Sequence, residues 1–425
     1  MSLVDSLATA AVPLPWGAWY EDSFHELRLP AHWQTDVLEP PLARALACDE
    51  IDRALMAPIG CRPLWELARG QRTACVVVDD LARPTKASDI LPPLLRQLHE
   101  AGIARQNIAI VIATGSHTAP GPGRVAWKVG ADVAATYRVE THRADGELAS
   151  TGIMFGDHEL RLNRTFLEAD LKVGIGAALP HSFAGYSGGA KLMLPGLSDL
   201  ACTSRSHKFV QMGLRGGANP NTNRFRTEIE EFARQVGFEY CVTVVPNARR
   251  ETAGVFAGDI VAAHRKACEF AAEKYRVDLH RTYDCLVLNA YPKDSDLLQA
   301  DNALVALKGL KSPAVRDGGV LVVASAACEG LGHHGLFGPG GLNYRPPRQK
   351  PGMGEREIWL YAPSVTEEEA RTIHWERFPF FRDSQALAEA LAQRFAGATR
   401  TAVLPSAPIE QLHDMRSESA TEGLA

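Results

Sequence analysis

Hydrophobic runs and amphipathic segments alternate along most of this chain. Runs rich in β-branched residues at 73–78 and 108–113 predict buried strands, and the segment 88–101 between them has helical periodicity and ends at Gly102. This order is typical of a βαβ unit, whose strands are parallel and whose crossover is right-handed. The apolar run 170–176, which ends in glycines, predicts a further buried strand. The N-terminal half therefore predicts a domain built on a parallel sheet.

The alternation continues through the C-terminal half and indicates a second α/β domain. A Gly-Asp pair at 156–157, between two strand-like segments, predicts a hairpin. Residues 338–354 are dense in Gly, Pro and basic residues and predict a mobile loop, and the polar last twenty residues predict little ordered structure. Further strands are expected at 239–245, 285–289, 319–324 and 402–404, and further helices at 224–236, 259–275, 302–310 and 384–395.

We therefore expect the α/β fold class, with two α/β domains. Residues 1–280 are predicted to form an N-terminal domain on a parallel sheet, and residues 281–425 a smaller, three-layer C-terminal domain. Clefts at domain interfaces are favoured ligand sites, so the active site is expected in the interdomain cleft.

The composition restricts the class of protein. Hydrophobic residues make up 46% and charged residues 22% of the 425, as in ordinary globular proteins, and the formal net charge of −5 argues against nucleic acid as a partner. The apolar runs are much shorter than a membrane span, and no basic segment precedes an apolar core at the N-terminus, so neither a membrane nor secretion is expected. The eight cysteines form no CxxC pair, which argues against a zinc ribbon and favours the reduced cytoplasm.

Polar side chains follow two of the predicted strands directly. The sequence Asp79-Asp80-Leu-Ala-Arg83 comes after the first strand, and Thr114-Gly-Ser-His117 comes after the second. Loops at the carboxyl ends of parallel strands are where open α/β sheets bind ligands, and an arginine with acids there suits anion binding and the orientation of a base. The alternatives are a helix N-terminal turn with a surface ion pair and an ordinary loop histidine.

A glycine-rich segment follows the strand at 170–176. It begins at His181 and contains a Ser-Gly-Gly turn before Lys191. Such a turn presents backbone N–H groups to an anion because no Cβ blocks the approach. It is not a Walker A loop, since Ala190 separates the glycines from the lysine and Leu192 follows it. Lys191 is either a phosphate ligand, a nucleophile or a solvated loop lysine, and His181 is either catalytic or an ordinary loop residue.

The remaining histidines are more ambiguous. His207 is either a residue near a helix N-terminus without function or a metal ligand, since histidine is the commonest protein ligand of first-row metals. No second ligand lies at metal spacing nearby, so a metal there would need most of its ligands from a cofactor. The adjacent His333 and His334 favour a structural loop, and His142 and His158 favour surface or hairpin positions.

These segments, in this order, resemble the nickel-pincer lactate racemase family of 2-hydroxyacid racemases and epimerases. The resemblance extends from about residue 75 to residue 310, with weaker similarity through 319–332. The motifs that carry it are DDxxRPT at 79–85, GxH at 115–117, HxxAGxSGGxK at 181–191 with Pro195 and Gly196, His207, and YPxD at 291–294 with Gln299.

The resemblance implies an isomerase that inverts C2 of a small-molecule 2-hydroxyacid by reversible hydride transfer. Its cofactor would be a nickel-pincer nucleotide, a pyridinium-3-thioamide-5-thiocarboxylic acid mononucleotide carrying nickel (Ni), which dedicated biosynthetic enzymes make and load. The N-terminal domain would bind this cofactor and supply the catalytic residues, and the C-terminal domain would close over the substrate.

The resemblance also assigns cofactor contacts to single residues. Lys191 matches the residue that binds the cofactor covalently through a thioamide, and His207 matches the one protein ligand of nickel. The pincer carbon and two sulfurs would complete a square-planar site, a geometry that Ni(II) favours. The other residues implied in cofactor binding are Thr85, Ser187, Gly188 and Gly189.

Substrate roles are implied in the same way. His117 and His181 match the paired general acid/bases, and histidine in general suits proton transfer in both directions because its ordinary pKa is near neutral. Arg83 matches the residue that holds the substrate carboxylate, and Asp80 matches the acid that supports this group. The resemblance also implies substrate contacts for Gln299 and Asn302.

Two departures argue against lactate as the substrate. Where lactate racemases have Tyr-Gln-x-x-Lys, this chain has Leu298, Gln299 and Asn302, so a hydroxyl and a charge are lost. Thr118 stands where a basic residue is common. We therefore expect a different 2-hydroxyacid. Two alternatives stay open: a dehydrogenase or dehydratase that uses the same cofactor, and a non-catalytic protein that binds a nucleotide or a hydroxyacid.

Overall fold

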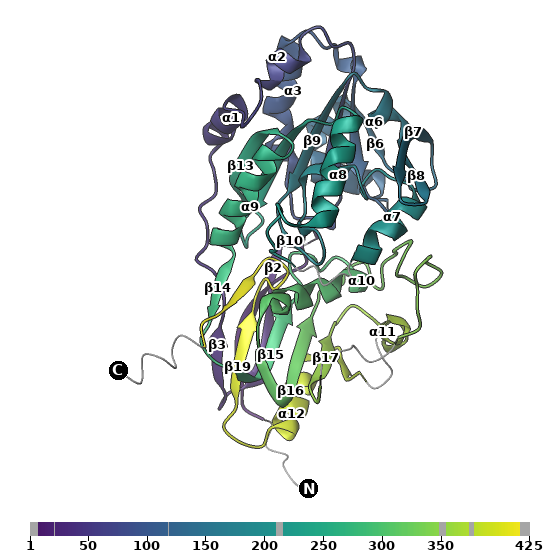
Figure 1. The fold of residues 1–425 in the computed structure, drawn as a ribbon. Coiled ribbons are helices and arrows are strands. Elements are labelled where there is room, and N and C mark those ends of the chain that lie inside the picture. Colours follow the sequence, from purple (N-terminus) through teal and green to yellow (C-terminus); the bar gives the residue numbers. More distant parts are fainter. Residues whose placement is uncertain are drawn as a thin grey trace. The chain divides into compact units, whose positions relative to one another are not determined.

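The chain divides into two compact units, which do not follow a single cut along the sequence. A computed structural model describes residues 7–20, 22–117, 119–209, 216–347, 354–373 and 378–416. The larger unit comprises residues 41–274 and 333–344, and the smaller unit comprises residues 1–40, 275–332 and 345–425. Each unit has its own sheet and its own hydrophobic core (Figure 1).

The larger unit is built on a six-stranded sheet in the order β13-β12-β9-β4-β5-β6. All neighbours are parallel except β12 and β13, which pair antiparallel. In the centre, Ala74 of β4 lies opposite Ile108 of β5 and Leu171 of β9, so the three strands end at the same edge. The strands are β4 (Ala74–Asp79), β5 (Ile108–Ala113), β6 (Arg138–Thr141), β9 (Leu171–Ala177), β12 (Tyr240–Pro246) and β13 (Thr252–Asp259).

Helices cover both faces of this sheet. Side chains alternate along a strand, so Val76 and Val78 of β4 enter one core and Cys75 and Val77 enter the other. This double burial explains why the strands read as continuous apolar runs in the sequence. The first core includes residues of α1 (Cys48–Met56), α2 (Leu64–Ala68), α3 (Leu91–Glu100), α4 (Pro122–Val129) and α5 (Ala131–Thr136), and the second includes residues of α6 (Arg164–Glu168), α7 (Leu200–His207) and α8 (Arg224–Gln235).

Further elements of the larger unit lie beside this sheet. The predicted hairpin around residues 156–157 is formed by β7 (Leu148–Phe155) and β8 (His158–Asn163). After β9 come the short strands β10 (Pro180–His181) and β11 (Gly185–Tyr186) and a 3₁₀ helix, η3 (Gly189–Leu192). The helix α9 (Ala262–Lys274) lies on the same side of the sheet as α8 (Figure 1), and an ion pair of 2.7 Å between Glu230 and Arg265 joins these two helices.

The smaller unit is a three-layer α/β structure, as predicted. Its six strands are all parallel, in the order β18-β17-β16-β15-β19-β3. The hairpin of β1 (Thr9–Trp16) and β2 (Ser23–Pro30), together with α12 (Ser384–Arg394), covers one face, and α10 (Leu297–Ala300), the 3₁₀ helix η5 (Asp301–Gly309) and α11 (Glu367–Ile373) cover the other. The strands are β3 (Gln34–Val37), β15 (Tyr283–Asn289), β16 (Val315–Ala324), β17 (Glu357–Tyr361), β18 (Phe380–Phe381) and β19 (Arg400–Leu404).

The division into units differs from the predicted domains 1–280 and 281–425. Residues 1–40 belong with the C-terminal half because β3 pairs with β19, from Gln34 opposite Arg400, and because Leu14 and Leu27 of the hairpin lie in the core of that unit. Residues 333–344 belong with the larger unit. Such long-range pairings leave no periodic signal in the local sequence.

Two local expectations also need correction. The predicted helix at 302–310 is a 3₁₀ helix, η5. The last twenty residues contain an ordered strand, β20 (Gln411–Asp414), which pairs parallel with β14 (Arg276–Leu279), while residues 417–425 lie outside the described part. Within the described residues, no helix combines the length and the apolar character needed to cross a lipid bilayer.

Candidate active site

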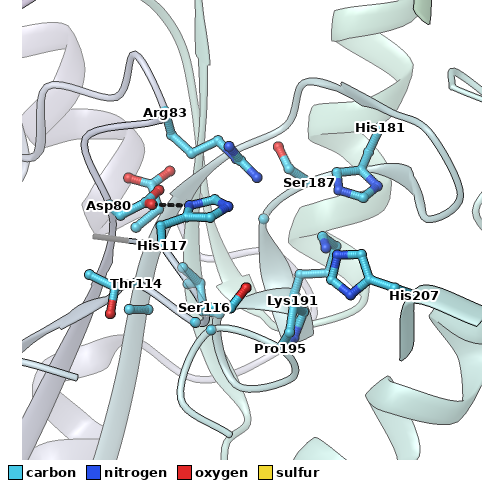
Figure 2. Close-up of a pocket in the computed structure, with 16 residues that line it drawn as sticks. Asp80, Arg83, Thr114, Ser116, His117, His181, Ser187, Lys191, Pro195 and His207 are labelled. Carbon is cyan, nitrogen blue, oxygen red and sulfur yellow. Dashed lines mark hydrogen bonds and ion pairs between the residues drawn. The ribbon is translucent and has the colours of Figure 1, made fainter. Parts of the chain in front are cut away.

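Three neighbouring parallel strands of the larger unit end at one cavity. The loops that follow β4, β5 and β9 line a hollow of about 570 Å³, which includes the part open to solvent. Several of the residues predicted from the sequence therefore meet at the carboxyl edge of the sheet, where open α/β sheets bind ligands. Figure 2 shows the side chains of this hollow, and the expected residues that line it are Asp80, Arg83, His117, His181, Ser187, Gly188, Lys191 and His207.

Asp80 fixes the protonation pattern of His117. The Asp80 Oδ2 atom accepts a hydrogen bond of 2.5 Å from His117 Nδ1, so the lone pair of the neutral ring lies on Nε2 (Figure 2). Burial by itself would raise the pKa of Asp80, but the neighbouring His117, Arg83 and Lys128 together lower it below its ordinary value. Asp80 is therefore a carboxylate at neutral pH and can stabilise a protonated His117, as the acid does in a serine-protease triad.

Lys128 is a buried lysine that was not predicted as a site residue, and it contacts the loop that follows β4. Lys128 Nζ lies 2.6 Å from Asp79 Oδ1 and donates to the backbone carbonyl of Asp80 at 3.0 Å. Its side chain is fully buried. Burial lowers the pKa of Lys128, and the Asp79 carboxylate opposes that shift. Thr85, expected to bind the cofactor, is absent from the lining of the hollow and donates from Oγ1 to Asp79 Oδ2 at 2.7 Å.

The glycine turn before Lys191 is held by Arg226, which does not line the hollow. Arg226 is buried and donates to the carbonyl of Gly188 at 2.9 Å and to that of Tyr186. Gly188 has a φ of +75°, and a Cβ there would lie 2.9 Å from the carbonyl oxygen of Ala177, so the turn requires glycine. This packing fixes the start of η3 and hence the position of Lys191.

The turn is less open to an anion than the sequence indicated. The backbone N–H of Ser187 donates to Leu179 O at 2.8 Å, and its hydroxyl bonds to the carbonyl of Ala177. Gly189 is absent from the lining, and its N–H interacts with the buried thiol of Cys241. Cofactor contacts by Ser187 and Gly189 therefore stay predictions.

Phe183 brings Lys191 and two of the histidines together. Lys191 is 8% exposed, and its Nζ lies 5.2 Å from the centre of the Phe183 ring. The same ring contacts His181 at 4.7 Å and His207 at 5.2 Å between ring centres. Phe183 could not be singled out from the sequence, because an aromatic residue in a glycine-rich segment is equally typical of a core.

His207 has the protonation state of a metal ligand. It is the last residue of α7, not a residue near its N-terminus, and its Nδ1 donates to Thr203 O at 2.8 Å because a carbonyl can only accept. The lone pair of the neutral ring is therefore on Nε2. Burial lowers the pKa of His207 to about 4, so the ring is neutral at pH 7. Among the described residues, no group of three or more His, Cys, Asp or Glu side chains is arranged to hold a metal ion.

His334 lies at the site, although the sequence favoured a structural loop for it. It is 7% exposed and forms an isolated antiparallel bridge with His117. The centre of its ring is 5.0 Å from that of His117 and 6.3 Å from that of His207. Burial, with His117 and His207 nearby, lowers the pKa of His334 to about 2. The structure therefore adds a fourth histidine, whose ring is neutral at pH 7, to the three that the motifs predicted.

The two expected substrate ligands of the C-terminal half lie in the smaller unit. Gln299 is part of α10, and Asn302 lies in η5. Asn302 Nδ2 donates to the backbone carbonyl of Gln299 at 2.8 Å and to its Oε1 at 3.1 Å. The departure at Thr118 lies outside the described residues. Substrate contacts by Gln299 and Asn302 stay predictions.

Comparisons with known proteins agree with the motifs. The lactate racemase N-terminal domain family matches residues 20–215. The chain is 29% identical over 294 residues to the lactate racemase of Thermoanaerobacterium thermosaccharolyticum and 28% identical over 297 residues to that of Lactiplantibacillus plantarum, covering 68% of each chain in both cases.

Solved structures show the same fold. The lactate racemase apoprotein of T. thermosaccharolyticum aligns with a TM-score of 0.73 and 23% identity over 95% of this chain and all of that chain. A protein from Thermotoga maritima aligns with a TM-score of 0.68 and 16% identity over 88% of this chain and all of that chain. These matches confirm the α/β fold. The chain is similar in sequence to lactate racemases and to the N-terminal domain family that carries their name.

Proposed function

We propose that this protein is a racemase or epimerase that inverts C2 of a 2-hydroxyacid other than lactate, with a nickel-pincer nucleotide held by Lys191 and His207. The observation that carries the proposal is the pair of imidazoles, His117 and His181, that enter one hollow from the ends of different strands. A pure binding protein has no need of two such groups beside a buried lysine.

The residues present fit the implied cofactor. Lys191 Nζ would form the covalent thioamide link, and the Nε2 lone pair of His207 would bind the nickel, since Nδ1 is committed to Thr203. One imidazole does not make a metal site by itself, and the two sulfurs and the carbon of the pincer would supply the other ligands. The chemistry that this group would supply, when bound by Lys191 and His207, is reversible hydride transfer at C2 of the substrate.

The two proposed acid/base histidines differ in which ring nitrogen carries the hydrogen of the neutral form. His117 carries its hydrogen on Nδ1, so its Nε2 can accept the proton of a substrate hydroxyl, and Asp80 stabilises the resulting cation. The backbone N–H of Ala184 points at His181 Nδ1 at 3.4 Å, which favours the hydrogen on Nε2 of that ring. In its imidazolium form, His181 would donate a proton to the substrate oxygen on the other side and return to the neutral ring. The roles reverse for the mirror-image substrate.

Arg83 supplies the positive charge for the substrate carboxylate. Its backbone carbonyl accepts from Lys128 Nζ at 3.3 Å, and its own Nη1 donates to Ala82 O at 3.1 Å, so the loop that carries it is held at two points. Its guanidinium points into the hollow beside His117 (Figure 2). A guanidinium binds a carboxylate through two parallel hydrogen bonds, and this would orient C2 between the two histidines.

The substrate is proposed to be larger or more hydroxylated than lactate. Asn302 replaces the family lysine and has no charge for a small carboxylate, and Leu298 replaces a tyrosine. We also propose that enzymes that make and load the cofactor act on this protein, and that it works in the cytoplasm, as its cysteine pattern indicates.

A substrate panel in deuterated water tests this function. The protein is produced together with the cofactor-making enzymes, incubated with pure enantiomers of many 2-hydroxyacids, and assayed by chiral chromatography and mass spectrometry. We expect inversion without deuterium at C2, because a transferred hydride does not exchange with solvent. Turnover of lactate but of no other acid contradicts the substrate proposal, and net formation of a 2-keto acid or a dehydrated product supports the alternative chemistry.

A further inference from the structure

Residues 333–344 fold with the larger unit, although the chain on both sides of them belongs to the smaller unit. We call this segment the histidine strap. Its own backbone makes it compact: Gly338 N donates to His334 O at 3.0 Å, Leu342 N to Gly335 O at 2.9 Å, and Asn343 N to Leu336 O at 2.8 Å. These bonds give the strap a defined shape.

The strap is hydrogen-bonded to two other segments, the loop that carries His117 and the helix that carries His207. Gly335 N donates to Ser116 O at 2.8 Å, next to the bridge between His334 and His117. At the other end of the strap, Asn343 Oδ1 accepts a hydrogen bond of 3.0 Å from the Ser204 hydroxyl of α7, the helix that ends at His207. The strap thus connects the loop of the acid/base to the helix of the proposed nickel ligand.

The His334 ring has a fixed orientation between these two histidines. The backbone N–H groups of Leu336 and Phe337 point at His334 Nδ1 at 3.1 and 3.4 Å, so its hydrogen lies on Nε2. The Phe337 ring packs against His334 at 5.0 Å and against His207 at 5.3 Å between ring centres. The His334 ring is oriented by its own loop and lies against the rings of His117 and His207. It therefore restricts the orientations that these two rings can adopt.

We propose that the histidine strap is part of the catalytic unit, and that His334 is a positioning residue that sets the ring orientations of His117 and His207. The orientations of the His117 and His207 rings do not depend on a bound cofactor. Their effect on catalysis rests on the proposed function. A displacement of about 1 Å at a reacting group costs roughly 100-fold in rate. Loss of the His334 ring is therefore expected to lower kcat by roughly 10- to 100-fold.

The substitution His334→Asn tests this without dismantling the strap. Its side-chain oxygen can still accept from the N–H of Leu336, so the strap keeps its internal bond, but the ring that contacts His117 and His207 is gone. The matched control is His333→Asn, one residue away at an exposed position. Ser204→Ala removes the bond between α7 and the strap and gives an independent test of the second attachment.

The first measurement needs no cofactor and no substrate. In apoprotein labelled with ¹⁵N and ¹³C at histidine, the imidazole signals of His117 and His207 are assigned from His117→Gln and His207→Gln. We expect both signals to move in His334→Asn and to stay in place in His333→Asn. Unchanged signals of His117 and His207 in a folded His334→Asn protein would overturn the proposal.

The second measurement uses the loaded enzyme. We expect His334→Asn to keep its cofactor adduct, to lose nickel to a chelator faster than wild type, and to show the loss in kcat with a smaller change in KM. Wild-type nickel retention and kcat in His334→Asn would contradict the positioning role. If the signals move but no loaded protein acts on any 2-hydroxyacid, the strap is confirmed and the proposed function fails.

Discussion

Asp80 and His117 come from the ends of two neighbouring parallel strands and meet in a hydrogen bond of 2.5 Å between Asp80 Oδ2 and His117 Nδ1. The bond directs the Nε2 lone pair of the histidine away from the acid. In the proposed mechanism, it also pairs a buried carboxylate with an imidazole that carries a positive charge for part of each cycle. The relationship explains why an acid and a histidine follow two successive strands in the sequence.

Replacing Asp80 with asparagine is expected to lower kcat by about 10²- to 10⁴-fold, because the amide no longer stabilises a protonated His117 and permits the wrong tautomer. KM should change much less. The measurement is steady-state racemisation with the best acid of the panel. Asp132→Asn, at an exposed position on α5, is the control and should keep wild-type kinetics. A fall in kcat of less than threefold in Asp80→Asn contradicts the assigned role.

Replacing Lys128 with methionine is expected to lower the free energy of unfolding by about 3–5 kcal/mol, because the Asp79 carboxylate stays buried without its cation. Urea unfolding of the apoprotein measures this directly. The double variant Lys128→Met/Asp79→Asn should recover part of the loss, since it removes the uncompensated charge. A loss below about 1 kcal/mol in Lys128→Met would show that the pair contributes little.

Replacing Gly188 with alanine is expected to move Lys191 and reduce cofactor loading. The new methyl group would meet the Ala177 carbonyl at 2.9 Å in a backbone conformation with φ of +75° that alanine rarely adopts. We expect a fall in the melting temperature and a smaller fraction of protein with the adduct by intact mass. Gly123→Ala in α4, where a Cβ has open space, is the control and should be neutral or slightly stabilising. Full loading of Gly188→Ala contradicts this account of the turn.

His142 makes stability depend on pH. The sequence favoured a surface position, which is wrong: the residue is 1% exposed, its Nε2 donates to Ser198 O at 3.1 Å, and burial lowers its pKa to about 4. In the unfolded chain, the His142 ring takes up a proton near pH 6.5, whereas in the folded chain it does so only near pH 4. The free energy of unfolding therefore decreases as the pH falls from 6.5 to 4. Going from pH 7 to pH 5 is expected to cost about 2 kcal/mol through this group.

Urea unfolding at pH 7 and pH 5 tests the His142 prediction. The difference between the two pH values should be smaller by about that amount in His142→Gln than in wild type. His158→Gln, at an exposed position on β8, should behave like wild type. An identical pH dependence in His142→Gln and wild type would show that the ring titrates normally.

Periodicity predicted the central strands well because burial on both faces makes them apolar without interruption. The run 108–113 matches β5, and the run 170–176 matches β9 within one residue at each end. The same signal predicted that Asp80 and His117 lie close together, since both stand directly after such runs and parallel strands end together. His158 was also placed correctly, on an exposed hairpin.

Long-range contacts were not predictable in this way. The pairing of β3 with β19 joins residues from opposite ends of the chain, and Ser116 and His334 are 218 residues apart in sequence. No local pattern encodes such a meeting. Lys128 was missed for a related reason, because its helix has an ordinary amphipathic sequence and only the fold buries its ammonium group next to Asp79.

Mass spectrometry of the loaded protein tests whether Lys191 holds the cofactor, on which the proposed function depends. After production with the cofactor-making enzymes, we expect an added mass on the intact wild-type chain, mapped by peptide sequencing to Lys191. The Lys191→Arg variant should lack this mass while its fold and melting temperature stay close to wild type. An adduct on another residue, or full racemase activity of Lys191→Arg without any adduct, would contradict the account.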